Sequence, residues 1–84
     1  MGYKITKDNI HTLPEQQQWS LVGKESNYNQ GKHRFRVLDD DKNIYLYGLS
    51  DCGSDFAPLD DYMYDYGCTE IQYWDEKVKK YRTL

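Results

Sequence analysis

The sequence predicts a small α+β or mostly β domain, with four or five antiparallel strands in a meander or a partly open barrel and one short helix. Alternating apolar and polar residues over 33–49 indicate a β-hairpin in the middle of the chain. Nine tyrosines and two tryptophans favour strands, whereas long helices use alanine freely and this chain contains only Ala57. Convincing helical periodicity is confined to residues 58–66.

The composition is that of one folded domain spanning residues 1–84. Ile, Leu, Val and Phe account for sixteen of the 84 residues, near the ~20% level below which chains tend to be disordered. Tyrosine and tryptophan add large side chains that can be buried, so we expect an aromatic core.

The chain has no stretch that approaches the ~20 apolar residues of a membrane span. Residues 1–7 also lack the apolar core of a signal peptide. We therefore expect a cytoplasmic protein without a membrane partner. Cys52 and Cys68 would then be thiols, and a disulfide is the alternative if the protein is exported.

The first part of the chain has the weakest pattern. Residues 1–17 are expected to form a loosely ordered N-terminal segment, with a short edge strand at 3–6 and a capped helical turn at 10–13. Residues 18–25 alternate in polarity and are expected to form the first well-defined strand.

The central hairpin has a polar turn at residues 39–43, where Asp, Lys and Asn suit a reversal of the chain. Side chains alternate along a strand, so one face of the hairpin should be apolar. The residues of that face are Phe35, Val37, Ile44 and Leu46. The opposite face would carry two basic and two aromatic side chains, Arg34, Arg36, Tyr45 and Tyr47.

The helix at 58–66 is bounded by Pro58, which suits a first helical position, and by Gly67, which suits the residue after the end. Its buried face would consist of Leu59, Tyr62, Met63 and Tyr66. A turn-rich loop is the alternative for this stretch. Two further strands, 68–75 and 78–83, would form a second hairpin with a turn at 75–77.

Charge is distributed unevenly along the chain. Residues 39–76 hold eleven acidic residues and one basic residue, Lys42, whereas the two flanking parts are basic and the net charge is −3. Such asymmetry suggests a basic partner met electrostatically, although acidic turn and cap residues would also produce it. The corresponding site is an acidic, tyrosine-containing face that could bind a basic protein surface or imitate nucleic-acid phosphates: Asp39, Asp40, Asp41, Asp60, Asp61, Tyr64 and Asp65.

A second hypothesis uses the basic and aromatic face of the hairpin, which consists of Arg34, Arg36, Tyr45 and Tyr47. Arginine and tyrosine on one sheet face could hold phosphates and stack bases of a single-stranded nucleic acid. Cation–π packing within the sheet, or pairing with Glu70 and Gln72, would explain the same residues without a ligand. Because the whole chain is acidic, we rank nucleic acid below a basic protein.

The sequence gives little support for a metal site or a catalytic site. The aspartates at 39–41, 51 and 55 are rich in oxygen ligands, but a calcium-binding EF-hand loop needs acids at alternate positions, a central glycine and a glutamate near its end, and residues 39–44 have no such glycine. The candidate zinc ligands His11, His33, Cys52 and Cys68 lack zinc-site spacing. A cysteine nucleophile would need a base beside it, and His33 could approach either cysteine, but nothing in the sequence places it there. We expect a non-catalytic protein without metal or cofactor.

Three stretches, Asp55–Asp61, Gly67–Tyr73 and the hairpin from His33, resemble a pattern in small uncharacterised bacterial proteins that phages or plasmids often carry. The resemblance covers about residues 33–74 and implies no activity and no catalytic residue. It favours an inhibitor encoded by a mobile element. The chain departs from the pattern at residues 62–66, where a loop with glycine or proline would be expected.

The two outer strands of the expected sheet could also mediate self-association. Unpaired edge strands can pair with a second copy of the same chain. We therefore expect that any homodimer would form through residues 3–6 or 78–83.

Overall fold

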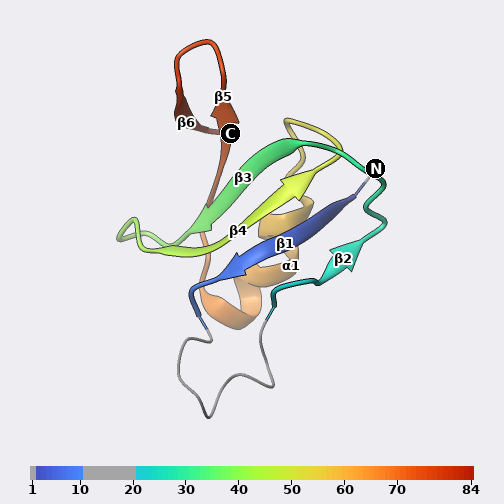
Figure 1. The fold of residues 1–84 in the computed structure, drawn as a ribbon. Helices are drawn as coiled ribbons and strands as arrows, with labels where there is room; N and C mark the ends of the chain where they lie inside the picture. Colours follow the sequence, from blue (N-terminus) through green and yellow to red (C-terminus); the bar gives the residue numbers. More distant parts are fainter. Residues whose placement is uncertain (1, 11–20) are drawn as a thin grey trace.

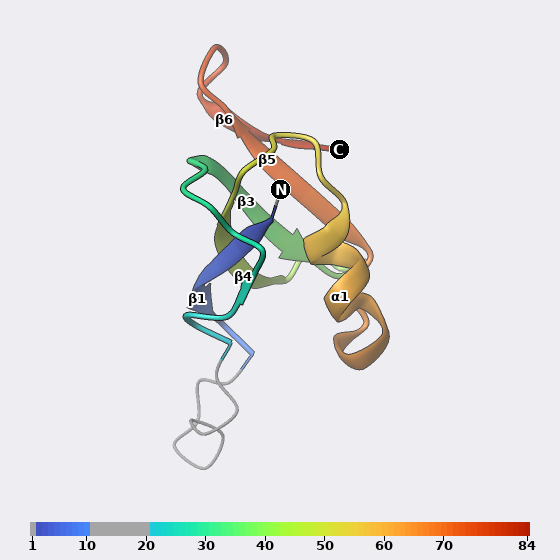
Figure 2. The same cartoon turned by 90° about the vertical axis from the view of Figure 1, so that its right-hand side faces the viewer.

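The computed structural model describes residues 2–10 and 21–84, which form one open sheet of six antiparallel strands with a helix on one side (Figures 1 and 2). The strand order is β2-β1-β4-β3-β5-β6. In chain order, the elements are β1 (Tyr3–Asp8), β2 (Glu25–Ser26), β3 (His33–Leu38), β4 (Ile44–Ser50), α1 (Ala57–Tyr66), β5 (Glu70–Asp75) and β6 (Lys80–Thr83). The mostly β, antiparallel prediction with one short helix is confirmed, and the structure has more strands than predicted.

The central hairpin is formed by β3 and β4, as predicted. Phe35 lies opposite Gly48 and Val37 lies opposite Leu46. The register then shifts so that Leu38 faces Ile44, which leaves Tyr45 as an extra residue in β4. This β-bulge changes the direction of the Tyr45 side chain, which packs against the buried core.

The sheet is not a meander, and β1 is not an edge strand. β1 lies between β2 and β4, and α1 carries the chain past β3, so that β5 pairs with the far side of β3. Among the described residues, the strand predicted at 18–25 is found only at Glu25, which belongs to β2. Residues 22 and 23 form a turn in which Gly23 has a φ of 88°, and strand pairing is limited to the two residues of β2.

Parts of the N-terminal predictions lie outside the described residues. These are residues 18–20 of the predicted strand and residues 11–13 of the predicted helical turn. Asp8 links the two described segments, because its carboxylate accepts the N–H groups of Ile10 and Leu21, each at 2.8 Å.

The helix predicted at 58–66 is present as α1, so the loop alternative is wrong. Asp55 Oδ1 accepts the N–H of Ala57 at 2.9 Å at the start of the helix. Gly67 ends it in the left-handed conformation, with a φ of 71°, and donates its N–H to Met63 O at 2.9 Å. No helix among the described residues is long and apolar enough to cross a membrane.

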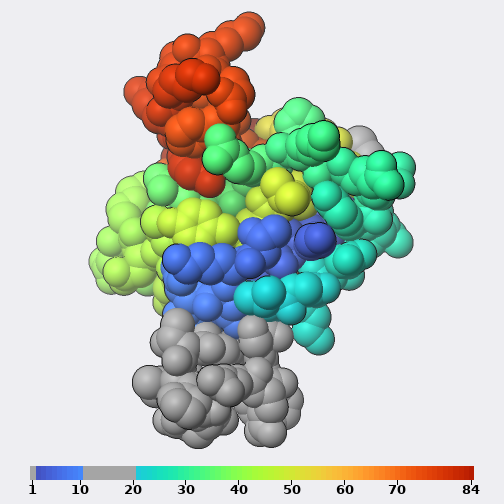
Figure 3. All heavy atoms as spheres, in the orientation of Figure 1, coloured from blue at the N-terminus to red at the C-terminus, as the bar shows by residue number. Residues whose placement is uncertain are grey.

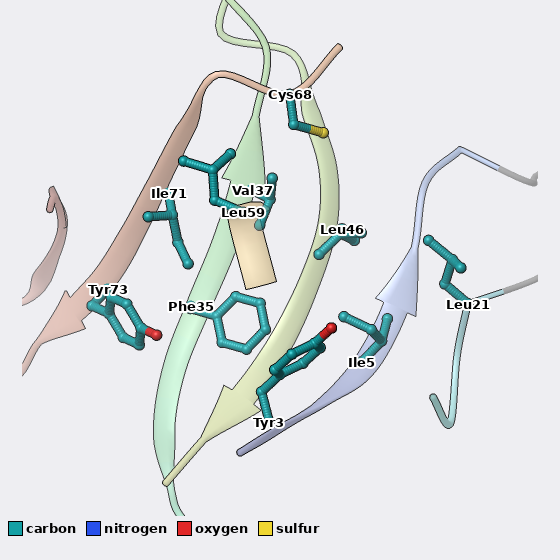
Figure 4. Packing of buried hydrophobic residues seen from close by; sticks show 10 residues of the cluster. All are labelled: Tyr3, Ile5, Leu21, Phe35, Val37, Leu46, Leu59, Cys68, Ile71 and Tyr73. Carbon is teal, nitrogen blue, oxygen red and sulfur yellow. The ribbon is translucent and has the colours of Figure 1, made fainter. Parts of the chain in front are cut away.

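The core lies between α1 and one face of the sheet, and aromatic rings form much of it, as predicted (Figure 4). The ring of Phe35 lies 6.0 Å from that of Tyr3 and 5.8 Å from that of Tyr73. Burial and a hydrogen bond to Asp61 raise the pKa of Tyr3. The cluster consists of Tyr3, Ile5, Leu21, Phe35, Val37, Leu46, Leu59, Cys68, Ile71 and Tyr73.

The C-terminal hairpin projects from the rest of the sheet (Figures 1 and 3). Its turn occupies residues 76–79, later than predicted, so Val78 belongs to the turn and is exposed. Trp74 lies opposite Tyr81 in the register of β5 and β6.

Candidate functional site on the open face of the sheet

The two faces of the sheet differ in what covers them. Helix α1 packs against one face, whereas none of the described elements covers the other (Figures 2 and 3). In Figure 3 the atoms of β1 and β4 lie at the surface of this uncovered side, and α1 is hidden behind them. We call it the open face and define it by three cations and three aromatic rings: Lys7, Arg34, Arg36, Tyr47, Trp74 and Tyr81.

The three aromatic rings of the open face form a connected row. The rings of Trp74 and Tyr81 are 5.2 Å apart in an edge-to-face arrangement. The ring of Tyr81 is also 6.5 Å from that of Tyr47, although β5 and β3 lie between β6 and β4 in the sheet. The C-terminal hairpin therefore leans over the open face, which makes this face concave.

Each ring of the row has a cation above it. The guanidinium carbon of Arg34 lies 4.6 Å from the Trp74 ring, and that of Arg36 lies 4.2 Å from the Tyr81 ring. The ammonium of Lys7 lies 5.7 Å from the Tyr47 ring. Stacking fixes the position of a guanidinium while its N–H edge can still donate hydrogen bonds.

Two polar neighbours hold the arginines in these positions. Arg36 Nε donates to Gln72 Oε1 at 2.6 Å. Arg34 Nη2 lies 3.5 Å from Glu76 Oε1, in a pair whose side chains are 52% and 67% exposed. An exposed pair of this kind is weak, so Arg34 can exchange Glu76 for another anion at little cost.

A pocket opens in the middle of the open face. Its volume is about 380 Å³, within the range typical of small-molecule sites. Residues from β1, β3, β4 and β6 form its lining: Thr6, Lys7, Arg34, Tyr47, Gly48, Leu49 and Tyr81.

The structure separates the four residues of the predicted basic and aromatic face. Arg34, Arg36 and Tyr47 lie together on the open face. Tyr45 does not, because the bulge in β4 directs it to the core, where partial burial and a hydrogen bond with Asp39 raise its pKa. The cation–π packing of the ligand-free interpretation is present, since Arg34 and Arg36 stack on rings of β5 and β6. Of the two pairing partners it named, Gln72 binds Arg36, whereas Glu70 binds Lys42.

Sequence reasoning missed three residues of the open face. Trp74 and Tyr81 alternate correctly within their strands, but their position beside Arg34 and Arg36 depends on the long-range pairing of β3 with β5. Lys7 reaches the open face because Thr6 is an extra residue in β1, which reverses the alternation that follows Ile5.

The predicted acidic face is present only in part. Asp60, Asp61, Tyr64 and Asp65 are all exposed on the outer side of α1, and Tyr64 is 91% exposed. Asp39 instead organises the β3–β4 turn, where its Oδ1 accepts the N–H groups of Asp41 and Asn43, each at 2.9 Å. Asp40 and Asp41 belong to the same turn and are exposed.

The remaining acids of this segment are used within the molecule. Glu70, Asp75 and Glu76 form ion pairs with Lys42, Arg82 and Lys79. Asp51 accepts backbone N–H groups from Gly2, Asn29, Gln30 and Gly31. The eleven acids of residues 39–76 therefore do not gather into one surface.

The described residues contain no group of three or more His, Cys, Asp or Glu side chains that could hold a metal ion. His11, one of the candidate zinc ligands, lies outside them. Cys52 Sγ contacts Ser54 Oγ at 3.5 Å, and Cys68 is buried in the core. Both cysteines are free thiols.

Comparison with known proteins adds no function and no residue role. The chain matches no protein-family model, and neither a curated protein nor a solved structure matches it.

Proposed function

We propose that this protein is a non-catalytic module that binds single-stranded nucleic acid through the open face. One observation carries the proposal: three aromatic rings lie in a connected row on an uncovered sheet face, each with a cation beside it. Aromatic rings stack on bases of any sequence, and cations beside them bind the phosphates.

The local charge of the open face supports an anionic ligand. Its cations come from Lys7, Arg34 and Arg36, and the nearest acids, Glu70 and Glu76, are already bound to bases. The net charge of the whole chain is −3, so at long range the protein as a whole repels a nucleic acid, and attraction is confined to the open face. Binding should therefore be modest in affinity and strongly dependent on salt.

The test measures fluorescence anisotropy of a labelled single-stranded DNA and of an RNA of the same length, at low and high salt. The double variant Arg34→Gln/Arg36→Gln should weaken binding about tenfold or more and lower the salt slope by about 1.4, since each phosphate contact to a single strand contributes about 0.7. Lys24→Gln/Lys32→Gln removes the same charge from two exposed lysines outside the open face and is the matched control. If the wild type binds neither strand at low salt, the proposal is wrong.

A second candidate function is binding of a basic protein through the outer side of α1. Tyr64 is 91% exposed and lies among Asp60, Asp61 and Asp65. Among the described residues, Asp60 and Asp65 form no ion pair. An exposed tyrosine among unpaired carboxylates is suited to a basic surface.

This candidate is tested by capture of partners from a cell lysate, followed by a salt wash. Asp60→Lys/Asp65→Lys should release partners that bind α1, whereas Glu25→Lys on β2 should not. Asp61 is left intact because it binds the Tyr3 hydroxyl. Retention of every partner by the α1 variant would exclude this surface.

A further inference from the structure

We infer that the pocket of the open face holds one unpaired nucleobase, so that the protein recognises the base as well as the charge of the strand. This inference rests on the proposed function and specifies the ligand of the same site.

The shape suits a flat ring. The rings of Tyr47 and Tyr81 are 6.5 Å apart and inclined by 59°, so they touch without stacking and border the pocket as two inclined walls, and we call the angle between these walls the notch. Leu49 and Gly48 from β4 complete the lining beside Tyr47. A base in this notch would stack on one tyrosine and meet the second at its edge, which are the two favoured arrangements of aromatic rings.

The cations of the pocket come from the strands on both sides of β4, which carries Tyr47. Lys7 belongs to β1 and Arg34 to β3, the two strands that flank β4. The backbones of those strands are roughly 10 Å apart, since neighbouring strands are about 4.8 Å apart. The phosphates on the 5′ and 3′ sides of one inserted base can therefore each meet a cation.

The pocket also discriminates between unpaired and paired bases. In a duplex, neighbouring bases cover both faces of each base, and its pairing partner covers one edge. A base must leave the stack before it can enter a notch between two tyrosines, and leaving it costs a few kcal/mol. A duplex should therefore bind only through its phosphates.

The test compares three labelled eight-nucleotide probes with the wild-type protein: oligothymidylate, the same sugar–phosphate chain with abasic sites, and a duplex. At equal salt, oligothymidylate should bind at least tenfold more tightly than the abasic chain, because the loss of one stacked base alone costs about tenfold. Leu49→Trp, which fills the pocket, should lower affinity for oligothymidylate about tenfold and leave affinity for the abasic chain unchanged. Tyr47→Leu should do the same, whereas Tyr47→Phe keeps the ring and should bind as the wild type does.

The outcomes separate this inference from the function on which it rests. Equal affinity of the wild type for oligothymidylate and for the abasic chain would overturn the base pocket and leave phosphate binding intact. Absence of binding to every probe would overturn both. The comparison of probes uses the unmodified protein, so it decides the question even if Leu49→Trp fails to fold.

Discussion

Glu70 lies on the same side of β5 as Gln72, and three neighbouring side chains bind its carboxylate. Lys42 and Thr83 donate to it, and Gln72 Nε2 donates at 2.8 Å. These hydrogen bonds, with that from Lys42 the largest contribution, lower the pKa of Glu70 from 4.5 to about 2. A carboxylate with a lowered pKa stabilises the fold above its ordinary pKa, and this contribution is lost as the pH falls through the folded-state value.

We therefore expect Glu70→Gln to destabilise the protein at neutral pH but not near pH 2. The loss in free energy of unfolding at pH 7 should be about 1 kcal/mol, a small value because Lys42 is largely exposed to solvent. Urea unfolding at pH 7, 4 and 2 measures it, with exposed Glu25→Gln as the control. An equal loss of stability at all three pH values would show that the ionised carboxylate of Glu70 is not the source of the stabilisation.

The two cysteines should differ in reactivity for reasons that belong to each residue. Burial raises the pKa of Cys68 to about 11, whereas hydrogen bonding with Ser54 lowers the pKa of Cys52. Because the thiolate is the reactive form, we expect a thiol reagent at pH 8 to modify Cys52 in the folded protein and to modify Cys68 only after unfolding. Mass spectrometry of the native and urea-treated protein counts the labels. Rapid labelling of Cys68 in the native state would contradict its burial.

At the scale of the elements, the end of α1 depends on one glycine. Gly67 has a φ of 71°, a conformation in which a side chain is strained. Gly67→Ala should therefore lower the free energy of unfolding by about 1 kcal/mol. Gly67→Asn should cost less, since asparagine tolerates this conformation. Thermal unfolding of both variants tests which one loses more stability. Equal losses of stability would show that the left-handed conformation of Gly67 is not their cause.

Local patterns predicted the elements better than their arrangement. The hairpin of β3 and β4 and the helix α1 could be predicted because alternation, helical spacing and the bounding Pro58 and Gly67 act within a few residues. The strand order could not, because the pairing of β3 with β5 joins residues more than thirty positions apart. The bulges at Thr6 and Tyr45 likewise depend on the partner strand, so Lys7 was missed and Tyr45 was assigned to the wrong face.

At the scale of the whole molecule, the sheet topology determines which strand edges and which surfaces a partner can bind. Because β1 is paired on both sides, a homodimer through residues 3–6 is not available, and β6 is the C-terminal edge. Lys80 and Arg82 on β6 are the kind of edge charges that disfavour pairing with a second copy. Asp60 and Asp65, which form no ion pair among the described residues, lie on α1 behind the sheet, whereas Arg34 and Arg36 stack on aromatic rings of the open face.

This separation of charge leads to a prediction that distinguishes the two candidate functions. The acids of α1 lie across the sheet from the open face, so their field should oppose the approach of a nucleic acid without any contact. Asp60→Asn/Asp65→Asn should therefore speed association with single-stranded DNA a few-fold at 0.01 M salt, where the screening length is about 30 Å. At 1 M salt the screening length is about 3 Å, and the gain should disappear.

Stopped-flow fluorescence measures these association rates, with Glu25→Gln/Asp40→Asn as a control of equal charge on the β2 edge and the β3–β4 turn. Because the α1 variant leaves every residue of the open face intact, its dissociation rate should equal that of the wild type. If α1 instead binds a basic protein, the same variant should lose that partner, and its rate of association with DNA should not increase. A faster dissociation of DNA from the α1 variant would mean that the helix touches the strand, which the position of α1 behind the sheet excludes.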